Sequence, residues 1–274
     1  MRRKIASIMA AALMFTAATP VCLSSVEAAS ATSSVKIANN SVCITTFKGN
    51  VFDQTVFFPE AMLSSNKKYP VVVWGNGTGA TSSLYYDLLS QISAGGYIVV
   101  ANNDRFCGSG ASESASVDFI IAENKKSGSI FNNKVDVEHI GAGGHSQGGK
   151  SAVNAALRNS NIDCVFNVAG IPTQSEASRL SVPTFFTAGT NDLIVPSFLW
   201  VKPAYNKCKA PAVYASLKNG LHLTCCDSPD VYAEYALDWF DAYLKNDSKA
   251  KTVFKKGGKL SKDSRWVDYA SKNL

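Results

Sequence analysis

The chain has 274 residues, 46% of them hydrophobic and 18% charged, and its formal net charge is +6. This length suffices for one large domain or two small ones, with a substantial buried core. The ordinary hydrophobic content and the modest charge argue against an intrinsically disordered chain and against a fibrous protein.

The first 28 residues have the three parts of a secretory signal peptide. Met1–Lys4 is basic, Ile5–Ala18 is apolar, and Val26–Ala28 fits a cleavage site of small residues. The apolar stretch is short and rich in alanine for a membrane span, so an uncleaved anchor is the weaker alternative. We therefore predict a signal peptide over residues 1–28. The mature protein is expected to be secreted, periplasmic or associated with the cell envelope.

The next residues predict a flexible segment followed by a single α/β domain. Residues 29–40 are rich in Ala, Ser, Thr and Asn, and we expect them to form a flexible mature N-terminus. A hairpin then follows, with strands Val42–Phe47 and Gln54–Phe58 around a Lys-Gly-Asn turn. Further strands are predicted at 69–74, 97–101, 139–142, 164–169, 182–188 and 212–217, and helices at 84–92, 117–126, 150–157, 198–206 and 231–244.

Apolar strands that alternate with helices indicate a mainly parallel sheet with helices on both faces. The hairpin ahead of that alternation predicts antiparallel strands at the N-terminal edge. Because neither a repeat nor a linker interrupts the pattern, we predict one catalytic domain over residues 41–246. Residues 247–274 are basic and have weak apolar periodicity, so we expect a tail or a peripheral helix there, or contact with an anionic surface.

One short motif carries most of the chemical information. Gly144-x-Ser146-x-Gly148 lies between a predicted strand and a predicted helix, as does the nucleophile elbow of serine hydrolases. A serine at such a turn occupies a strained backbone position, and glycines two residues on either side avoid clashes with the neighbouring strand and helix. The turn pushes the hydroxyl out of the sheet beside the N-terminus of the helix.

The same stretch also satisfies the phosphate-binding P-loop pattern, Gly144-x-x-x-x-Gly149-Lys150-Ser151. A P-loop normally follows the first strand of its domain, whereas this motif follows several. We therefore interpret Lys150 and Ser151 as residues of the first helical turn, and nucleotide binding is the less favoured alternative.

A nucleophilic serine needs a base, and the chain contains three histidines. His139 begins the strand that enters the elbow, and His145 belongs to the elbow and points away from the hydroxyl. His222 follows the last predicted parallel strand, at the sheet edge where parallel-sheet enzymes place their chemistry. His222 is therefore the predicted base.

The base in turn needs a carboxylate that holds its tautomer. Asp163 precedes a strand and lies at the wrong end of the sheet, and Glu176 lies in a polar loop. Asp192 directly follows a strand, and the order Ser146, Asp192, His222 is the one expected for this type of fold. We predict Asp192 as the orienting acid, with a simple Asx turn as the alternative.

Two backbone N–H groups would stabilise the developing oxyanion. The residue after the nucleophile, Gln147, is the predicted first donor. The second is expected from the glycine-rich loop after the strand at 69–74, from Gly77 or Thr78, with Gly77 preferred. An ordinary glycine-rich turn is the alternative.

The motifs around Ser146, Asp192 and His222 resemble those of α/β-hydrolases, and in particular the secreted bacterial cutinase and polyester-hydrolase group. Dienelactone-hydrolase-like and chlorophyllase-like proteins are also similar. The resemblance spans residues 42–246 and implies an α/β-hydrolase fold that cleaves carboxylic esters. Gly77 stands where that group has an aromatic residue, so a ring that would clamp the substrate is missing. The short connection between residues 169 and 182 predicts no lid domain and an open site.

The predicted chemistry is hydrolysis of short-chain or polymeric esters through an acyl-enzyme, without a metal or an organic cofactor. We expect an ester as the substrate, no nucleic-acid partner, no membrane span and a monomer. An acyltransferase or peptidase with the same triad remains open, as does a secreted binding protein that has lost catalysis. Four aromatic residues are either groove-lining or core: Trp74, Tyr85, Phe106 and Trp200.

Cleavage of the signal peptide would leave six cysteines, an even number that predicts disulfide bonds in an exported protein. Cys225 and Cys226 are adjacent, and each is expected to pair elsewhere. We hypothesise a bridge from Cys208 to one of them that would brace the loop carrying His222. The cysteine spacings do not favour a zinc site.

Overall fold

The computed structural model describes residues 36–38, 41–49 and 51–274. The predicted signal peptide, residues 1–28, lies outside the described residues, as does most of the predicted N-terminal segment 29–40. Among the described residues, no helix has both the length and the apolar character that crossing a membrane requires.

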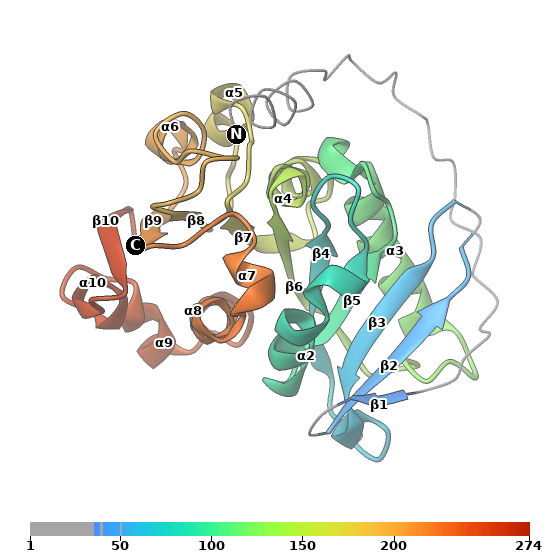
Figure 1. The fold of residues 1–274 in the computed structure, drawn as a ribbon. Helices are drawn as coiled ribbons and strands as arrows, with labels where there is room; N and C mark the ends of the chain where they lie inside the picture. The colour runs from blue at the N-terminus through green and yellow to red at the C-terminus, as the bar shows by residue number, and fades with distance from the viewer. Residues whose placement is uncertain (1–35, 39–40, 50) are drawn as a thin grey trace.

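A ten-stranded sheet forms the centre of the molecule, and its strand order is β1-β2-β3-β5-β4-β6-β7-β8-β9-β10 (Figure 1). The strands are β1 (Lys36–Ala38), β2 (Val42–Phe47), β3 (Gln54–Pro59), β4 (Tyr69–Gly75), β5 (Ile98–Asn102), β6 (Val135–His145), β7 (Ile162–Val168), β8 (Thr184–Gly189), β9 (Ala212–Leu217) and β10 (Trp266–Lys272). The helices are α2 (Tyr86–Ala94), α3 (Ala111–Lys125), α4 (Gln147–Arg158), α5 (Gln174–Ser178), α6 (Val201–Lys207), α7 (Thr224–Asp227), α8 (Asp230–Leu244), α9 (Ser248–Val253) and α10 (Lys259–Lys262).

The six strands β4 to β9 are parallel to one another. Strands β1, β2 and β3 form an antiparallel N-terminal edge, in which β3 pairs antiparallel with β5. This arrangement is the α/β-hydrolase fold, as the sequence predicted. The predicted hairpin and the alternation of strands and helices are both confirmed.

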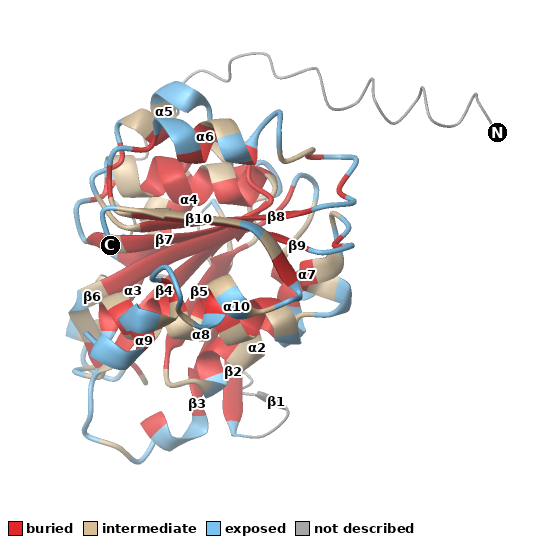
Figure 2. Cartoon of the chain, turned by 90° about the vertical axis from the view of Figure 1, so that its left-hand side faces the viewer, coloured by how far each residue is buried: buried red, intermediate tan, exposed pale blue. Residues whose placement is uncertain are grey.

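Strand β4 shows how the sheet is buried on both faces. Val71 and Val73 point into one apolar layer, which they share with α3, α4 and α6. Val72 and Trp74 point into the other, which they share with α2 and α8. Figure 2 shows α4, α5 and α6 on one side of the sheet and α2, α8, α9 and α10 on the other. Continuous apolar strands are therefore required, because successive side chains enter opposite layers.

The order in which successive strands are added to the sheet reverses at β4. Strand β5 lies on one side of β4, and β6 to β9 follow on the other. The carboxyl ends of β4 and β6 pair closely, with Gly75 opposite Gly144. Ligand sites of open α/β sheets form at such a reversal, and the loop after β4 and the motif after β6 both begin here.

The C-terminal segment 247–274 differs from the predicted tail or peripheral helix. It forms α9, α10 and strand β10, which pairs antiparallel with β9 and closes the sheet (Figure 1). Three widely spaced apolar residues, Phe254, Leu260 and Trp266, are buried against α8 and hold the segment in place. The sequence did not indicate this because three single anchors produce little periodicity.

Helix α3 also differs from its prediction, because it begins at Ala111 rather than near Val117. Gly110 precedes it in the left-handed conformation, with φ of 76°. The first turns bury the polar residues Ser112, Glu113 and Ser116. Buried polar residues hide a helix from any analysis of apolar periodicity.

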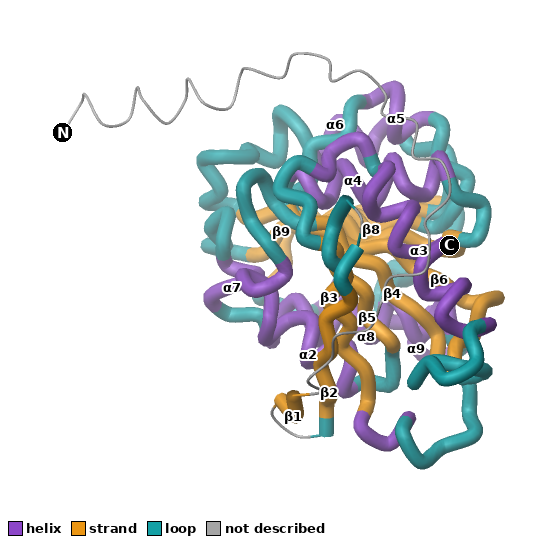
Figure 3. Tube along the Cα trace, turned by 90° about the vertical axis from the view of Figure 1, so that its right-hand side faces the viewer, coloured by secondary structure: helices purple, strands orange, loops and turns teal. Residues whose placement is uncertain are grey.

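Between β7 and β8 the chain forms only the short helix α5. This helix lies beside α6 (Figure 3). Thr173 caps this helix by accepting a hydrogen bond from the Glu176 N–H, while the Glu176 carboxylate accepts from the Thr173 N–H. Residues 169–183 therefore make a compact connection, and the predicted absence of a lid domain is confirmed for this part of the chain.

The prediction of disulfide bonds is wrong for the described residues, in which all six cysteines are free thiols. The proposed bridge from Cys208 is absent, since its thiol is buried and faces the Ala210 carbonyl. The Cys225 and Cys226 sulfur atoms lie 3.8 Å apart in α7. The cysteines serve mainly as small apolar residues of the two core layers, a role that an even count does not reveal.

Cys226 is expected to be the first of these thiols to react with Ellman's reagent in the folded protein. It is the one that is not fully buried, and a hydrogen bond with the Cys225 thiol lowers its pKa. Stopped-flow thiol titration should therefore show a fast phase that Cys226→Ser removes and Cys208→Ala retains. A fast phase that persists in Cys226→Ser would contradict this assignment.

Candidate active site

Ser146 lies between β6 and α4, in a backbone conformation that is rare for residues other than glycine, with φ of 58° and ψ of −119°. Its N–H donates to the Val168 carbonyl at 2.9 Å, which ties the turn to the end of β7. The Ser146 side chain is partly exposed, whereas Gln147 is buried. Such strain persists only where the surrounding structure enforces it.

The glycines of the motif are required by contacts between backbones. A Cβ atom at Gly144 would lie 2.2 Å from the Gly148 carbonyl oxygen. A Cβ atom at Gly148 would lie 1.9 Å from the Gly75 carbonyl oxygen. Strand β6, helix α4 and the end of β4 therefore meet more closely than any side chain would allow.

His222 and Asp192 come together as the sequence predicted. The His222 Nδ1 atom lies 2.7 Å from Asp192 Oδ2, and both side chains are largely withdrawn from solvent. The other oxygen, Asp192 Oδ1, accepts hydrogen bonds from the N–H groups of Ile194 and Val195. The Asx-turn alternative is thus also present, but it uses a different oxygen from the one that contacts the histidine.

The loops that carry Asp192 and His222 are joined to each other. The Asn191 N–H donates to the Gly220 carbonyl at 2.9 Å, and the Asn219 N–H donates to Thr190 Oγ1 at 2.8 Å. These bonds fix the separation of the two loops at the carboxyl ends of β8 and β9. Asp192 and His222 are therefore held by two loops that are bonded to each other at the ends of rigid strands.

His145 is a buried histidine whose role the sequence did not indicate. Its Nε2 atom lies 2.8 Å from the His222 carbonyl oxygen, and its Nδ1 atom lies 3.0 Å from the Tyr85 hydroxyl. Because a carbonyl can only accept, Nε2 carries the proton and Nδ1 accepts from Tyr85. Burial, together with the neighbouring His222, lowers the pKa of His145 to about 3, so the ring is neutral.

The Tyr85 hydroxyl oxygen in turn accepts a hydrogen bond from the Gly77 N–H at 2.9 Å. A continuous chain of bonds thus runs from Gly77 through Tyr85 and His145 to the backbone of His222. It joins the loop after β4 to the loop that holds the predicted base. Little in the sequence indicated that Tyr85 takes part in such a chain, because a tyrosine in a helix-like stretch is normally a core residue.

This chain bears on the choice of the second oxyanion donor. The Gly77 N–H is already used by Tyr85, whereas the Thr78 N–H has no hydrogen-bond partner in the described part of the chain. The preference for Gly77 is therefore not supported, and Thr78 is the better candidate. The Gln147 N–H is the first of α4 and has no acceptor within that helix.

The geometry does not favour the P-loop alternative. Lys150 Nζ lies 3.4 Å from a Glu176 carboxylate oxygen, so the lysine pairs with a side chain of α5. The Ser151 side chain lies on the buried face of α4 and is not available to a metal ion. Both residues belong to the helix that follows the elbow, as we interpreted them.

The four aromatic residues divide into two pairs. Trp74 and Tyr85 are buried in the core, whereas Phe106 and Trp200 are exposed. Trp200 belongs to a group of exposed apolar side chains on the two loops that carry the predicted acid and base. An exposed apolar group of this kind indicates a binding surface. The group consists of Leu193, Ile194, Phe198, Leu199, Trp200, Leu221 and Leu223.

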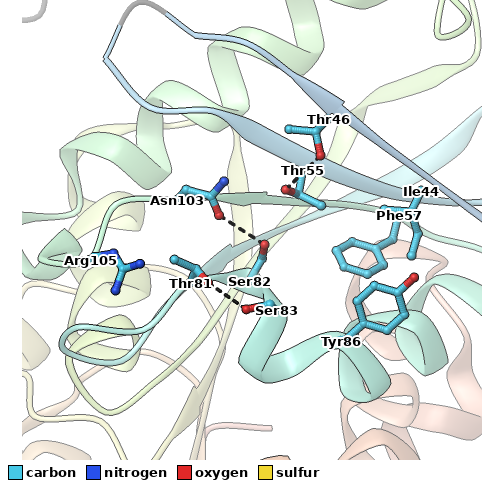
Figure 4. A pocket seen from close by; sticks show the side chains of 10 residues that line it. All are labelled: Ile44, Thr46, Thr55, Phe57, Thr81, Ser82, Ser83, Tyr86, Asn103 and Arg105. Carbon is cyan, nitrogen blue, oxygen red and sulfur yellow. Dashed lines mark hydrogen bonds between the residues drawn. The ribbon is translucent and has the colours of Figure 1, made fainter. Parts of the chain in front are cut away.

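A separate hollow of about 630 Å³ lies between the β2–β3 hairpin and the start of α2. Figure 4 shows Phe57 and Tyr86 at one end of it, Arg105 at the other, and the hydroxyl groups of Thr46, Thr55 and Ser82 between them. None of the predicted site residues lines this hollow. The candidate active site is instead the open region around the Ser146 elbow.

The sheet with its flanking helices defines an α/β-hydrolase. Residues 16–269 match the model of the PET hydrolase-like family, so the chain belongs to that family. It is also similar to a bis(hydroxyethyl) terephthalate hydrolase from Streptomyces coelicolor, with 22% identity over 217 aligned residues. The alignment covers 77% of this chain and 66% of the relative, so it spans just under two thirds of that relative's length.

Proposed function

We propose that this protein is a serine hydrolase of carboxylic esters, with Ser146 as the nucleophile, His222 as the base and Asp192 as the orienting acid. The observation that carries the proposal is the 2.7 Å contact between His222 Nδ1 and Asp192 Oδ2. The His222 backbone also contacts His145, the residue before the strained Ser146 turn. Membership of the PET hydrolase-like family supports ester hydrolysis as the chemistry.

In the proposed mechanism, the Ser146 hydroxyl attacks the ester carbonyl while His222 takes its proton through Nε2. Asp192 holds the opposite nitrogen, Nδ1, in its protonated form and stabilises the imidazolium that develops. His222 then protonates the leaving alcohol. Water, activated by the same histidine, hydrolyses the acyl-enzyme and regenerates the serine.

The tetrahedral intermediates place negative charge on the former carbonyl oxygen. In this proposal the N–H groups of Gln147 and Thr78 donate to that oxygen. Both N–H groups are held in place before the substrate binds. Gln147 is fixed as the first residue of α4, and Thr78 follows Gly77, whose N–H is bonded to the Tyr85 hydroxyl. The N-terminal end of α4 adds a favourable dipole.

The exposed apolar side chains on the loops of Asp192 and His222 favour an ester with an apolar body. The relative is named for an ester of an aromatic dicarboxylic acid, so we include aromatic esters in the proposed substrate class. A side chain at Gly77 would meet the Tyr85 hydroxyl at 2.9 Å and His145 at 3.3 Å, which accounts for glycine at the aromatic position. We also propose export, on the strength of the basic and apolar segments in residues 1–28.

Hydrolysis of p-nitrophenyl esters from acetate to long-chain acyl tests this function. We expect turnover by the wild type, and a fall in kcat of about 10³-fold or more in Ser146→Ala. A fluorophosphonate should label the wild type at Ser146. The control Ser175→Ala, at an exposed serine of α5, should retain both activity and labelling. Equal activity in Ser146→Ala and the wild type would overturn the proposal, as would no activity on any ester.

A further inference from the structure

Glu113 is a buried acid to which the mechanism above gives no role. It lies in the first turn of α3, and its exposed fraction is 0%. In the described ranges neither carboxyl oxygen has a hydrogen-bond partner of standard geometry, although the Ser151 hydroxyl lies close enough to influence the group. Burying an acid in this way destabilises the fold, because both a charge and an unpaired polar group are costly away from water. The presence of Glu113 here therefore calls for an explanation.

The carboxyl group lies where the two backbones of the proposed oxyanion hole meet. A Cβ atom at Gly75, the last residue of β4, would be 2.6 Å from Glu113 Oε2. The same atom would be 2.8 Å from the Gly148 carbonyl oxygen, in the first turn of α4. The loop that starts at Gly75 carries Thr78, and α4 starts with Gln147. Glu113 thus lies between the end of β4, which leads to Thr78, and the first turn of α4, which contains Gln147.

Burial disfavours the charged form of this carboxyl group. Burial raises the pKa of Glu113 well above its ordinary value, and the nearby Ser151 hydroxyl offsets only part of that effect. The titratable group that faces it is the Cys107 thiol, whose own pKa is raised to about 12 by burial. Gly75 from β4 and Ser151 from α4 contribute no charge. Full burial without a neighbouring cation therefore favours the neutral carboxylic acid.

If the proposed function is correct, the charge state of Glu113 bears directly on catalysis. An ionised carboxylate behind both donors would repel the negative charge that develops in the transition state. The repulsion would be strong, because the intervening medium is protein rather than water. A neutral acid of the same shape fills the space between the two backbones without this repulsion.

We propose that Glu113 is a positioning residue that sets the spacing of the Thr78 and Gln147 donors. It does so by filling the junction between Gly75 and the first turn of α4. This inference rests on the proposed function and adds to it a residue that does not touch the substrate.

The neutral state is tested by stability, independently of activity. The unfolded chain ionises Glu113 near pH 4, whereas burial moves its ionisation in the folded chain to higher pH. Wild-type stability is therefore lost progressively as the pH rises between these values. Glu113→Gln removes this loss, so its melting temperature should rise relative to the wild type between pH 5 and pH 8.

Glu123→Gln is the matched control for the stability measurement. Glu123 lies on the same helix and is equally buried, but its carboxylate pairs with Ser129 and Lys126. We expect this variant to be less stable than the wild type at pH 8. A melting-temperature difference for Glu113→Gln that does not change with pH would overturn the neutral-acid assignment.

The positioning role is tested by kinetics on a p-nitrophenyl ester. Glu113→Gln should keep kcat within about threefold of the wild type at pH 7, because the amide has the same shape and no charge. Glu113→Ala should lose about 10- to 100-fold in kcat with little change in KM, because the junction can collapse. At alkaline pH the wild type should lose kcat as Glu113 ionises, and Glu113→Gln should not.

The outcomes separate this inference from the proposed function. If the wild type hydrolyses no ester, the proposed function fails. If the wild type is active and folded Glu113→Ala matches it in kcat, the positioning role alone is wrong. A Glu113→Gln variant with a kcat as low as that of Glu113→Ala would also overturn that role. A neutral side chain of the same shape would then have failed to maintain the activity.

Discussion

Replacing Asp192 by asparagine is expected to lower kcat for ester hydrolysis by about 10³- to 10⁴-fold while the fold remains intact. The amide oxygen can still accept from the N–H groups of Ile194 and Val195, as Asp192 Oδ1 does. The amide NH₂ then faces His222 Nδ1 and donates to it. His222 must therefore carry its proton on Nε2, where it cannot accept the proton of Ser146.

Asp163→Asn is the matched control for this experiment. Asp163 is the other aspartate between the proposed nucleophile and base, and its carboxylate accepts from the Ile140 N–H at 2.8 Å, near the start of β7. We expect its kcat to stay within about threefold of the wild type. The measurement is kcat and KM with p-nitrophenyl acetate, alongside thermal unfolding. More than a tenth of wild-type kcat in folded Asp192→Asn would rule out Asp192 as the orienting acid.

Replacing Gly148 by alanine is expected to destabilise the protein by more than about 4 kcal/mol. The added methyl group would lie 1.9 Å from the Gly75 carbonyl oxygen and 2.3 Å from its carbon. Both atoms belong to the backbone of a central strand, so neither can move without disturbing β4. For a domain of this size, the melting temperature should fall by about 10 °C or more.

Gly128→Ala provides the comparison for a glycine without close neighbours. Gly128 has a φ of 84°, and no atom lies within 4 Å of the position that a Cβ atom would take. Alanine there introduces only backbone strain, which amounts to about 1–2 kcal/mol. Differential scanning calorimetry of both variants measures the contrast. Equal stability losses would show that the contact between α4 and β4 is looser than these distances indicate.

Much of the fold could be predicted because the relevant signals are local. The valine-rich run of β4 has the pattern of a strand buried on both faces, and the glycines around Ser146 mark a turn between a strand and a helix. Asp192 and His222 each directly follow a strand. Since parallel strands end at one edge of the sheet, sequence position alone predicted that these two residues would meet. Their contact in the structure agrees with that prediction.

Other features could not be predicted because they depend on contacts between distant segments. Strand β10 is held by Phe254, Leu260 and Trp266, three anchors too widely spaced to produce a pattern. The cysteines are distributed among separate parts of the core, so their even number had no bearing on pairing. Composition and spacing do not report which side chains become neighbours.

The proposed site divides in the same way. The sequence by itself predicted the elbow, the order of the proposed triad and two candidate oxyanion donors. Only the tertiary structure favours Thr78 over Gly77, because the Tyr85 hydroxyl accepts the Gly77 N–H and His145 holds Tyr85 in place. Only the tertiary structure placed Glu113 between Gly75 and the first turn of α4. The physical reason is that the environment of a polar group depends on which groups fold against it, and that environment determines its hydrogen bonds and its charge.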